Sequence, residues 1–155
     1  MEMGVGSGAS VRMWRDYFPN GQITGFDINP DCQKETNLPH ILIVTGDQSI
    51  ETDLDYACSL HSSGYYIIND DAGHQPEHQL FAFKHLLLRL PPGGIYILED
   101  IGNHTVTEYL SRLAHRVVHA NWNDDNDPFI RDHASKVESV SFYRDTSVTV
   151  MKEQF

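Results

Sequence analysis

Positively charged side chains are scarce in this chain: 11 lysines and arginines stand against 22 aspartates and glutamates. The formal net charge of -11 repels phosphate backbones and anionic lipid headgroups, and no basic stripe interrupts the acidic sequence. The charge balance therefore argues against nucleic acid and membrane surfaces as partners. A small molecule or another protein is the partner that this composition favours.

Cysteine and long apolar runs are limited as well. The two cysteines, Cys32 and Cys58, lack the close spacing of a zinc clip, and no stretch has the length of a membrane helix or the pattern of a secretory leader. We therefore expect a cytoplasmic protein with reduced thiols. With 155 residues, 40% of them hydrophobic, the chain can build one core but not two, so we expect residues 1–155 to form a single domain.

Apolar runs of strand length alternate with segments of helical periodicity. The strand-like runs are GQITGFDI, HILIVTGD, GYYIINDD and GGIYILED, and the helical segments are residues 10–18, 53–60, 76–90 and 107–120. This alternation predicts crossovers between parallel strands. Two last strand-like runs, 137–145 and 147–153, predict an antiparallel hairpin at one edge. The expected fold is α/β, a doubly wound and mostly parallel sheet with an antiparallel hairpin at its C-terminal end.

Acidic residues fall repeatedly at the ends of the predicted strands. They are Asp27 after ITGF, Asp47 after LIVTG, Asp70 and Asp71 after YYIIN, and Glu99 and Asp100 after IYIL. In a doubly wound sheet, ligands bind outside the carboxyl ends of the strands. Scattered solvated charges would not return to the same edge at each of these strands, so the sequence predicts a ligand site there.

Three alternating glycines, Gly4, Gly6 and Gly8, stand in the opening stretch EMGVGSG. Glycines in this position let the backbone approach a ligand closely and turn sharply into a helix that begins near Ser10. The three glycines alone are weak evidence for a ligand site, because an ordinary strand-to-helix turn can contain the same glycines. They also lack the spacing of the third glycine in the dinucleotide-binding fingerprint. It gains weight from Asp27, about 20 residues later, where a carboxylate can bind both hydroxyls of a ribose.

The chain resembles the class I S-adenosylmethionine-dependent methyltransferases. The resemblance rests on Glu2 with the three glycines, on Asp27, on Asp47-Gln48 in GDQS and on the closing hairpin, and it covers nearly the whole chain. It implies a Rossmann-like sheet in which the glycine turn passes under the methionine part of the cofactor. It further implies that Asp27 holds the ribose and that Asp47 and Gln48 lie near the adenine. Glu2 and Asp70 are expected to complete the cofactor site.

The segment NDDAGH carries a second candidate site. Asp71 leaves the fourth predicted strand and Asp100 leaves the fifth, so in a parallel sheet their carboxylates stand beside each other at one edge. Hard oxygen donors with room for waters suit Mg²⁺, which can hold a diol and lower the pKa of one hydroxyl. His74, on the same loop as Asp71, is placed to accept that proton near neutral pH.

This second segment resembles the metal-dependent sugar O-methyltransferases that act on macrolide antibiotics, together with the cephalosporin-hydroxylase-like proteins. Those proteins carry D-D-G-S-H after the fourth strand and E-D after the fifth, where this chain has Asp70-Asp71-Ala72-Gly73-His74 and Glu99-Asp100. The resemblance implies Asp71 and Asp100 as metal ligands, and His74 as the general base with Asp71 beside it in catalysis. It implies an S-adenosylmethionine-dependent, Mg²⁺-assisted O-methyltransferase whose acceptor is a small natural product or its sugar.

The chain departs from this group at two points. Ala72-Gly73 replaces Gly-Ser, and the substantial segment that members carry before the first strand is lacking, so that strand is reduced to about MEM. A central strand this short leaves backbone groups unpaired and apolar surface exposed. We expect another subunit or a swapped segment to cover it, and hence a homo-oligomer. A sequence that begins too late is the alternative.

A purely structural interpretation of the candidate site residues stays open. Asp70 or Asp71 can cap the helix that begins near Pro76, Asp100 can bind the backbone of its own loop, and His74 can be a loop histidine without chemistry. Residues 121–129, NWNDDNDPF, are expected to form an exposed polar loop, since the glycine and glutamate of a calcium loop are absent. Two other functions also stay open: an enzyme of this fold that dehydrates, isomerises or cyclises a natural product, and a non-catalytic binding subunit.

Overall fold

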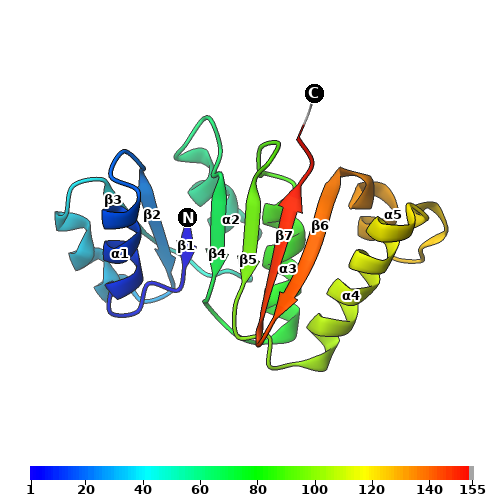
Figure 1. Cartoon of the computed structure of the whole chain (residues 1–155). Coiled ribbons are helices and arrows are strands. Elements are labelled where there is room, and N and C mark those ends of the chain that lie inside the picture. Colours follow the sequence, from blue (N-terminus) through cyan, green and yellow to red (C-terminus); the bar gives the residue numbers. More distant parts are fainter. Residues whose placement is uncertain (154–155) are drawn as a thin grey trace.

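The computed structural model describes residues 1–153, without the side chains of residues 35–37. In this part of the chain, seven strands form one sheet in the order β3-β2-β1-β4-β5-β7-β6 (Figure 1). The strands are β1 (Glu2–Met3), β2 (Ile23–Asp27), β3 (Ile41–Thr45), β4 (Ile67–Asp70), β5 (Ile95–Leu98), β6 (Val137–Tyr143) and β7 (Thr146–Met151). The strands β1 to β5 run parallel, whereas β7 is antiparallel to β5 and β6. The predicted doubly wound sheet with its antiparallel C-terminal hairpin is confirmed.

Helices and 3₁₀ turns connect the strands. They are α1 (Ala9–Tyr17), α2 (Glu51–Ser59), α3 (Pro76–Leu87), α4 (His104–His119) and α5 (Pro128–His133), with 3₁₀ turns at Pro30–Asn37, Trp122–Asp124 and Ala134–Lys136. The helix α3 begins at Pro76, as predicted, because the first turn of a helix does not need the hydrogen bond that proline cannot donate. Among the described residues, no helix is both long and apolar enough to cross a membrane.

The larger of two apolar clusters lies on the sheet face that α2, α3 and α4 cover. Its fully buried side chains include Met3, Phe26, Leu54, Phe83, Leu98, Leu110 and Leu113. The helix α1 packs on the opposite face through a smaller cluster that includes Val5, Val11 and Ile43. Strands of a parallel sheet are apolar on both sides, so both faces need cover.

The central strand β1 joins the glycine turn to its two neighbours. It is only two residues long, as the sequence predicts. The carbonyl of Met3 accepts a hydrogen bond from the amide of Asp71 at 2.9 Å, and the amide of Gly4 donates to the carbonyl of Phe26 at 2.8 Å. The turn that follows β1 is therefore anchored both to β2 and to the loop after β4.

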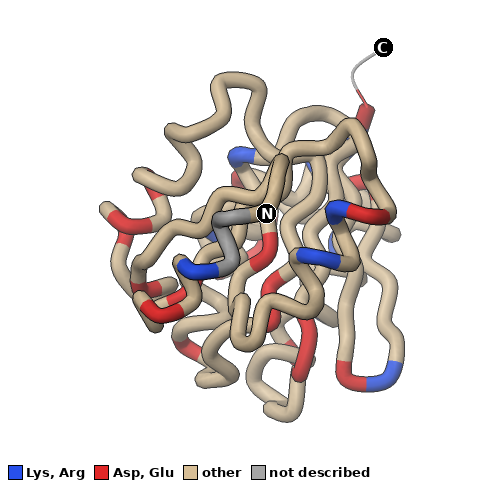
Figure 2. The backbone as a smooth tube through the Cα atoms, turned by 90° about the vertical axis from the view of Figure 1, so that its left-hand side faces the viewer, with Lys and Arg blue, Asp and Glu red and all other residues tan. Residues whose placement is uncertain are grey.

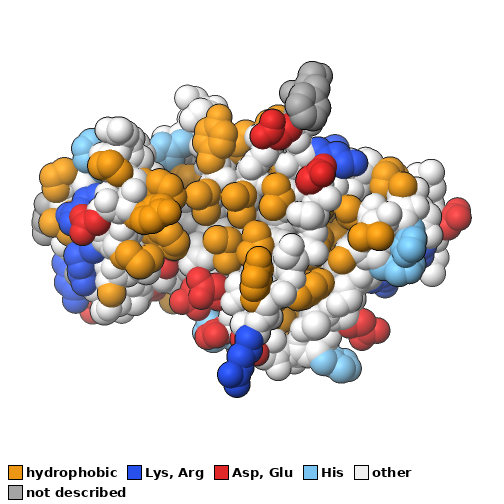
Figure 3. Space-filling model, viewed as in Figure 1, with side chains coloured by type: hydrophobic (Ala, Val, Ile, Leu, Met, Phe, Trp, Pro, Cys, Tyr) orange, Lys and Arg blue, Asp and Glu red, His pale blue; other side chains and the backbone are white. Residues whose placement is uncertain are grey.

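The helix α1 packs on one part of its sheet face, and over β4, β5 and β7 the same face is only half buried. Ile67 on β4, Ile95 and Ile97 on β5, and Val148 and Val150 on β7 are all partly exposed, whereas the residues that alternate with them are buried. Figure 3 shows hydrophobic side chains gathered over the middle of this face. A groove of about 550 Å³ lies beside them, and its lining includes Trp14 and Tyr17 of α1 and Tyr65 and Tyr66 before β4. Apolar surface of this kind is typical of an interaction surface.

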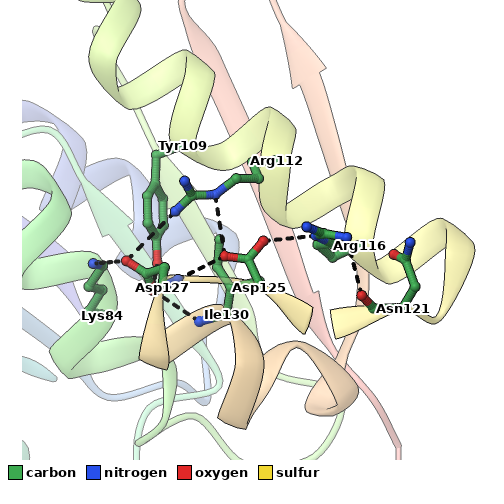
Figure 4. A network of polar contacts seen from close by, with 8 residues as sticks. All are labelled: Lys84, Tyr109, Arg112, Arg116, Asn121, Asp125, Asp127 and Ile130. Carbon is green, nitrogen blue, oxygen red and sulfur yellow. Dashed lines mark hydrogen bonds and ion pairs between the residues drawn. The ribbon is translucent and has the colours of Figure 1, made fainter. Parts of the chain in front are cut away.

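A charged network connects α4 to the segment before α5 (Figure 4). Asp125 is 3% exposed and accepts a hydrogen bond from Nε of Arg116 at 2.8 Å, while Nε of Arg112 lies 3.7 Å from its other oxygen. Asp127 extends the network to Lys84, Tyr109 and the amide of Ile130. The prediction that residues 121–129 form an exposed loop is wrong at Asp125, because two arginines of α4 compensate the burial of its charge.

Replacing Asp125 with asparagine is expected to lower the free energy of unfolding by about 2–3 kcal/mol at neutral pH, because charged hydrogen bonds to arginine are lost. Burial would raise the pKa of Asp125, but hydrogen bonds from the Asp127 amide and from Arg116 outweigh it and hold the pKa below its ordinary value of 3.8. The ionised carboxyl therefore stabilises the fold above that value, and this contribution is lost as the pH falls through the lower folded pKa.

Urea unfolding between about pH 7 and about pH 3 checks this prediction, since the difference between wild type and Asp125→Asn should shrink in the acid range. Asp124→Asn, at an exposed neighbouring position, is the control and should follow the wild type throughout. A difference that does not change with pH would contradict the assignment of the stabilisation to the ionised carboxyl.

Candidate functional site

The glycine turn lies between β1 and α1 and touches the loop after β4. Gly4 has a φ of 85°, and a Cβ at this position would stand 2.1 Å from the carbonyl oxygen of Asp71. Gly6 and Gly8 also have positive φ, and Gly8 caps α1 without a side-chain hydrogen bond. Only glycine permits so close an approach of the two backbones. The turn predicted for the cofactor is thus in contact with the loop predicted for the metal.

Asp27, the last residue of β2, holds the turn in place. One carboxylate oxygen accepts hydrogen bonds from the amides of Val5 and Gly6 at 2.7 and 3.0 Å, and the other accepts from the amide of Asn29 at 2.8 Å. Burial would raise the pKa of Asp27, but these hydrogen bonds outweigh it and hold the pKa below its ordinary value. Asp27 is therefore an anion on the wall that faces the candidate ligand site.

A cavity of about 590 Å³ opens beside the turn. Its walls come from the turn and the start of α1, from Phe26–Ile28, from Gly46–Gln48, from residues 71–73 and from His78. This volume lies within the range of small-molecule sites. The aromatic groove near Tyr17 and Tyr65 is similar in size, at about 550 Å³, but it lies at the opposite ends of the strands. Of these two, the cavity beside the turn lies where a doubly wound sheet binds ligands.

Five of the residues predicted to bind the cofactor line this cavity: Gly4, Gly6, Asp27, Asp47 and Gln48. Glu2, Gly8 and Asp70 do not, and Gly8 instead caps α1. Glu2 is 2% exposed and accepts a hydrogen bond from Nε1 of Trp14 at 2.5 Å. Asp70 is 1% exposed and accepts one from the hydroxyl of Tyr96 at 2.7 Å. The structure places both carboxyls inside the fold, because the side chains of a strand alternate between its two faces, and these two point to faces that are covered.

His78 lines the cavity too, although its place one turn into α3 gives no direct sign of this in the sequence. Hydrogen bonds from the amide and hydroxyl of Ser49 lower the pKa of Asp47, and the charge of His78 lowers it further. Asp47 is therefore ionised at neutral pH and is a second carboxylate in the lining of the cavity, beside Asp27.

Asp71, His74 and Asp100 come together at the carboxyl ends of β4 and β5. One ligand atom of each lies within 4.8 Å of the others, all three residues are exposed, and Nε2 of His74 is 3.7 Å from Oδ2 of Asp100. Burial raises the pKa of Asp71, and the charges of Glu99 and Asp100 raise it further. Figure 2 shows several acidic segments in the lower half of the view, where the parallel strands end.

This cluster fits a divalent cation. Carboxylate oxygens are the hard donors that Mg²⁺ prefers, an exposed position leaves room for the waters it keeps, and a cation would relieve the repulsion that raises the pKa of Asp71. The structure brings the three residues together as their positions at neighbouring strand ends predict. The roles of Asp71 and Asp100 as ligands and of His74 as base stay a prediction.

Curated proteins similar to this chain are O-methyltransferases. The mycinamicin VI 2''-O-methyltransferase of Micromonospora griseorubida is 33% identical over 108 residues, which are 65% of this chain and 26% of that protein. The 8-demethyl-8-alpha-L-rhamnosyl tetracenomycin-C 2'-O-methyltransferase of Streptomyces olivaceus is 36% identical over 109 residues, which are 65% of this chain and 28% of that protein. The chain thus spans about a quarter of the length of the curated relatives it matches. No protein-family model matches the chain.

Among solved structures, the MycE methyltransferase from the mycinamycin biosynthetic pathway, in complex with Mg, SAH and mycinamycin VI, superposes with a TM-score of 0.82. The two chains are 24% identical, and the match covers 98% of this chain and 44% of that one. A likeness at this identity establishes the fold. The chain therefore has a Rossmann-like methyltransferase fold, and over 65% of its length its sequence resembles these O-methyltransferases.

Proposed function

We propose that the chain carries the cofactor and metal site of an S-adenosylmethionine-dependent, Mg²⁺-assisted O-methyltransferase that acts on a small natural product or its sugar. The observation that carries this proposal is the position of Asp71. It lines the cavity beside the glycine turn and also belongs to the cluster with His74 and Asp100. A methyl donor in the cavity and an acceptor hydroxyl at the cluster would therefore be neighbours, as methyl transfer requires. The printed activities of the curated relatives, and the Mg and SAH bound to MycE, support it.

In this proposal the cavity binds S-adenosylmethionine. The carboxylate of Asp27 accepts the ribose hydroxyls, and the turn that contains Gly4, Gly6 and Gly8 leaves room for the methionine part. Asp47 and Gln48, on the opposite wall, lie nearest the adenine. The acidic surface and the small volume of the cavity favour a small-molecule acceptor over nucleic acid or a membrane.

Asp71 and Asp100 would hold Mg²⁺, which lowers the pKa of an acceptor hydroxyl when it is bound. His74 then accepts the hydroxyl proton on a ring nitrogen, and the carboxylate of Asp100, 3.7 Å from Nε2, stabilises the imidazolium that results. Proton removal and cofactor binding are therefore assigned to different residues, which makes the two roles separable by mutation.

Incubation with S-adenosylmethionine, Mg²⁺ and a panel of macrolide and rhamnosyl glycosides with free sugar hydroxyls tests this function. We expect S-adenosylhomocysteine and a methylated glycoside in equal amounts, and neither product in the presence of EDTA. A changed glycoside without S-adenosylhomocysteine would point to the non-methylating enzyme instead. An unchanged panel, together with no binding of the cofactor, would contradict the proposal.

We also propose a homo-oligomer in which a second copy of the chain covers the half-buried apolar face of β4, β5 and β7. The partly exposed isoleucines and valines of that face and the aromatic groove beside it support this arrangement. Self-complementary apolar patches of this kind form two-fold dimers. Sedimentation velocity at micromolar concentration should give a dimer or a larger assembly. A monomer at every concentration would contradict it.

A further inference from the structure

The loop after β4 carries two of the three cluster residues, and its backbone is held at separate points. The amide of Asp71 donates to the carbonyl of Met3, and the carbonyl of Asp71 packs against Gly4. Farther along the loop, Nε2 of Gln48 donates to the carbonyl of Gly73, and the amide of Gly73 donates to Oε1 of Gln48, both at 2.9 Å. The loop is therefore held at its start by β1 with the glycine turn, and next to His74 by Gln48.

Gln48 follows β3 and contacts both the cavity and the loop after β4. Its side chain is 6% exposed, although Gly73 and His74 are exposed. Each end of its amide faces the complementary group of one residue, so both the donor and the acceptor are used and the orientation of the amide is defined. It also lines the cavity next to Asp47. One buried side chain thus contacts the cofactor cavity and the backbone that precedes His74.

We propose that Gln48 is a positioning residue that couples the cofactor cavity to the metal cluster, so that S-adenosylhomocysteine and Mg²⁺ each strengthen the binding of the other. The inference rests on the proposed function, because it assigns these two ligands to these two places. A ligand that contacts Gln48 limits the motion of its side-chain amide. Because this amide forms two hydrogen bonds with Gly73, the motion of the Gly73 backbone is limited as well. A loop held in one position presents Asp71 for an ion to bind, and by linkage the ion favours the cofactor by the same factor.

Calorimetric titration of the full chain with Mg²⁺, with and without saturating S-adenosylhomocysteine, measures this coupling. In the wild type we expect the affinity for Mg²⁺ to rise by about 5-fold or more when S-adenosylhomocysteine is present. In Gln48→Ala the factor, taken as the ratio of the Mg²⁺ affinities with and without S-adenosylhomocysteine, should fall close to one, even if a higher concentration of S-adenosylhomocysteine is needed for saturation. Gln48→Glu keeps the acceptor for the Gly73 amide but loses the donor to the carbonyl, so it should lose the coupling as well. Gln22→Ala, at an exposed position before β2, is the matched control and should keep it.

The outcomes separate the two proposals. An unchanged coupling factor in both Gln48 variants, or a wild type that binds the two ligands independently, would overturn the role of Gln48 and leave the proposed function standing. A wild type that binds neither ligand would overturn the proposed function and the coupling with it. Thermal unfolding of each variant establishes that it is folded. A coupling factor close to one then means that the two sites are no longer coupled, and not that the variant is unfolded.

Discussion

Replacing His74 with alanine is expected to lower the turnover of methyl transfer by about 10²–10⁴-fold, the usual contribution of a general base. The affinity for S-adenosylmethionine should stay within about 3-fold of the wild type, because His74 is absent from the walls of the cofactor cavity. Turnover from single-turnover kinetics and affinity from calorimetry together check this prediction.

His119→Ala, at an exposed position near the end of α4, is the control for the loss of an imidazole and should leave both quantities unchanged. If the turnover and the cofactor affinity of His74→Ala fall by the same factor, His74 is not the base and its loop has a structural role only.

Replacing Gly4 with alanine is expected to abolish cofactor binding and to lower the free energy of unfolding by about 2–5 kcal/mol, from overpacking together with backbone strain. The new Cβ would stand 2.1 Å from the carbonyl oxygen and 2.7 Å from the carbonyl carbon of Asp71, and the φ of 85° is unfavourable for alanine. Since both contacts are backbone atoms, the glycine turn or the loop after β4 has to move. Thermal unfolding and calorimetry with S-adenosylmethionine measure the two effects.

Gly6→Ala is a matched control on the same turn. Gly6 also has a positive φ, of 52°, but a Cβ there meets nothing within 4 Å. Gly6→Ala should therefore lower the free energy of unfolding by only about 1 kcal/mol, from backbone strain. Equal melting temperatures for the two variants would show that the contact between the turn and the loop is not what makes Gly4 necessary.

The order of strands and helices followed from the sequence because hydrophobic periodicity and turn residues are local signals. The hairpin is one case: the predicted runs 137–145 and 147–153 correspond to β6 (Val137–Tyr143) and β7 (Thr146–Met151), which pair antiparallel. The gathering of Asp71, His74 and Asp100 followed as well, since neighbouring parallel strands end at one edge.

Side-chain direction and long-range partners were harder to predict. Asp70 ends β4 and Asp71 follows it directly, yet the side chain of Asp70 points to Tyr96 in the core whereas Asp71 lies at the cavity. The burial of Asp125 depends on Arg116, which reaches it from another element, so a polar stretch of sequence gave no sign of it. Likewise, the paired hydrogen bonds of Gln48 cross 25 positions of sequence, and only the folded chain brings these groups together.

The most direct test of the account is a calorimetric titration of S-adenosylmethionine into the wild type and into Asp27→Ala, with and without Mg²⁺. Asp27 is ionised and lines the cavity, and charged hydrogen bonds contribute about 1.5–3 kcal/mol each. We predict micromolar binding to the wild type and an affinity at least about 10-fold weaker for the variant. No binding to the wild type in either condition, or equal binding to both proteins, would contradict the assignment of this cavity to the cofactor.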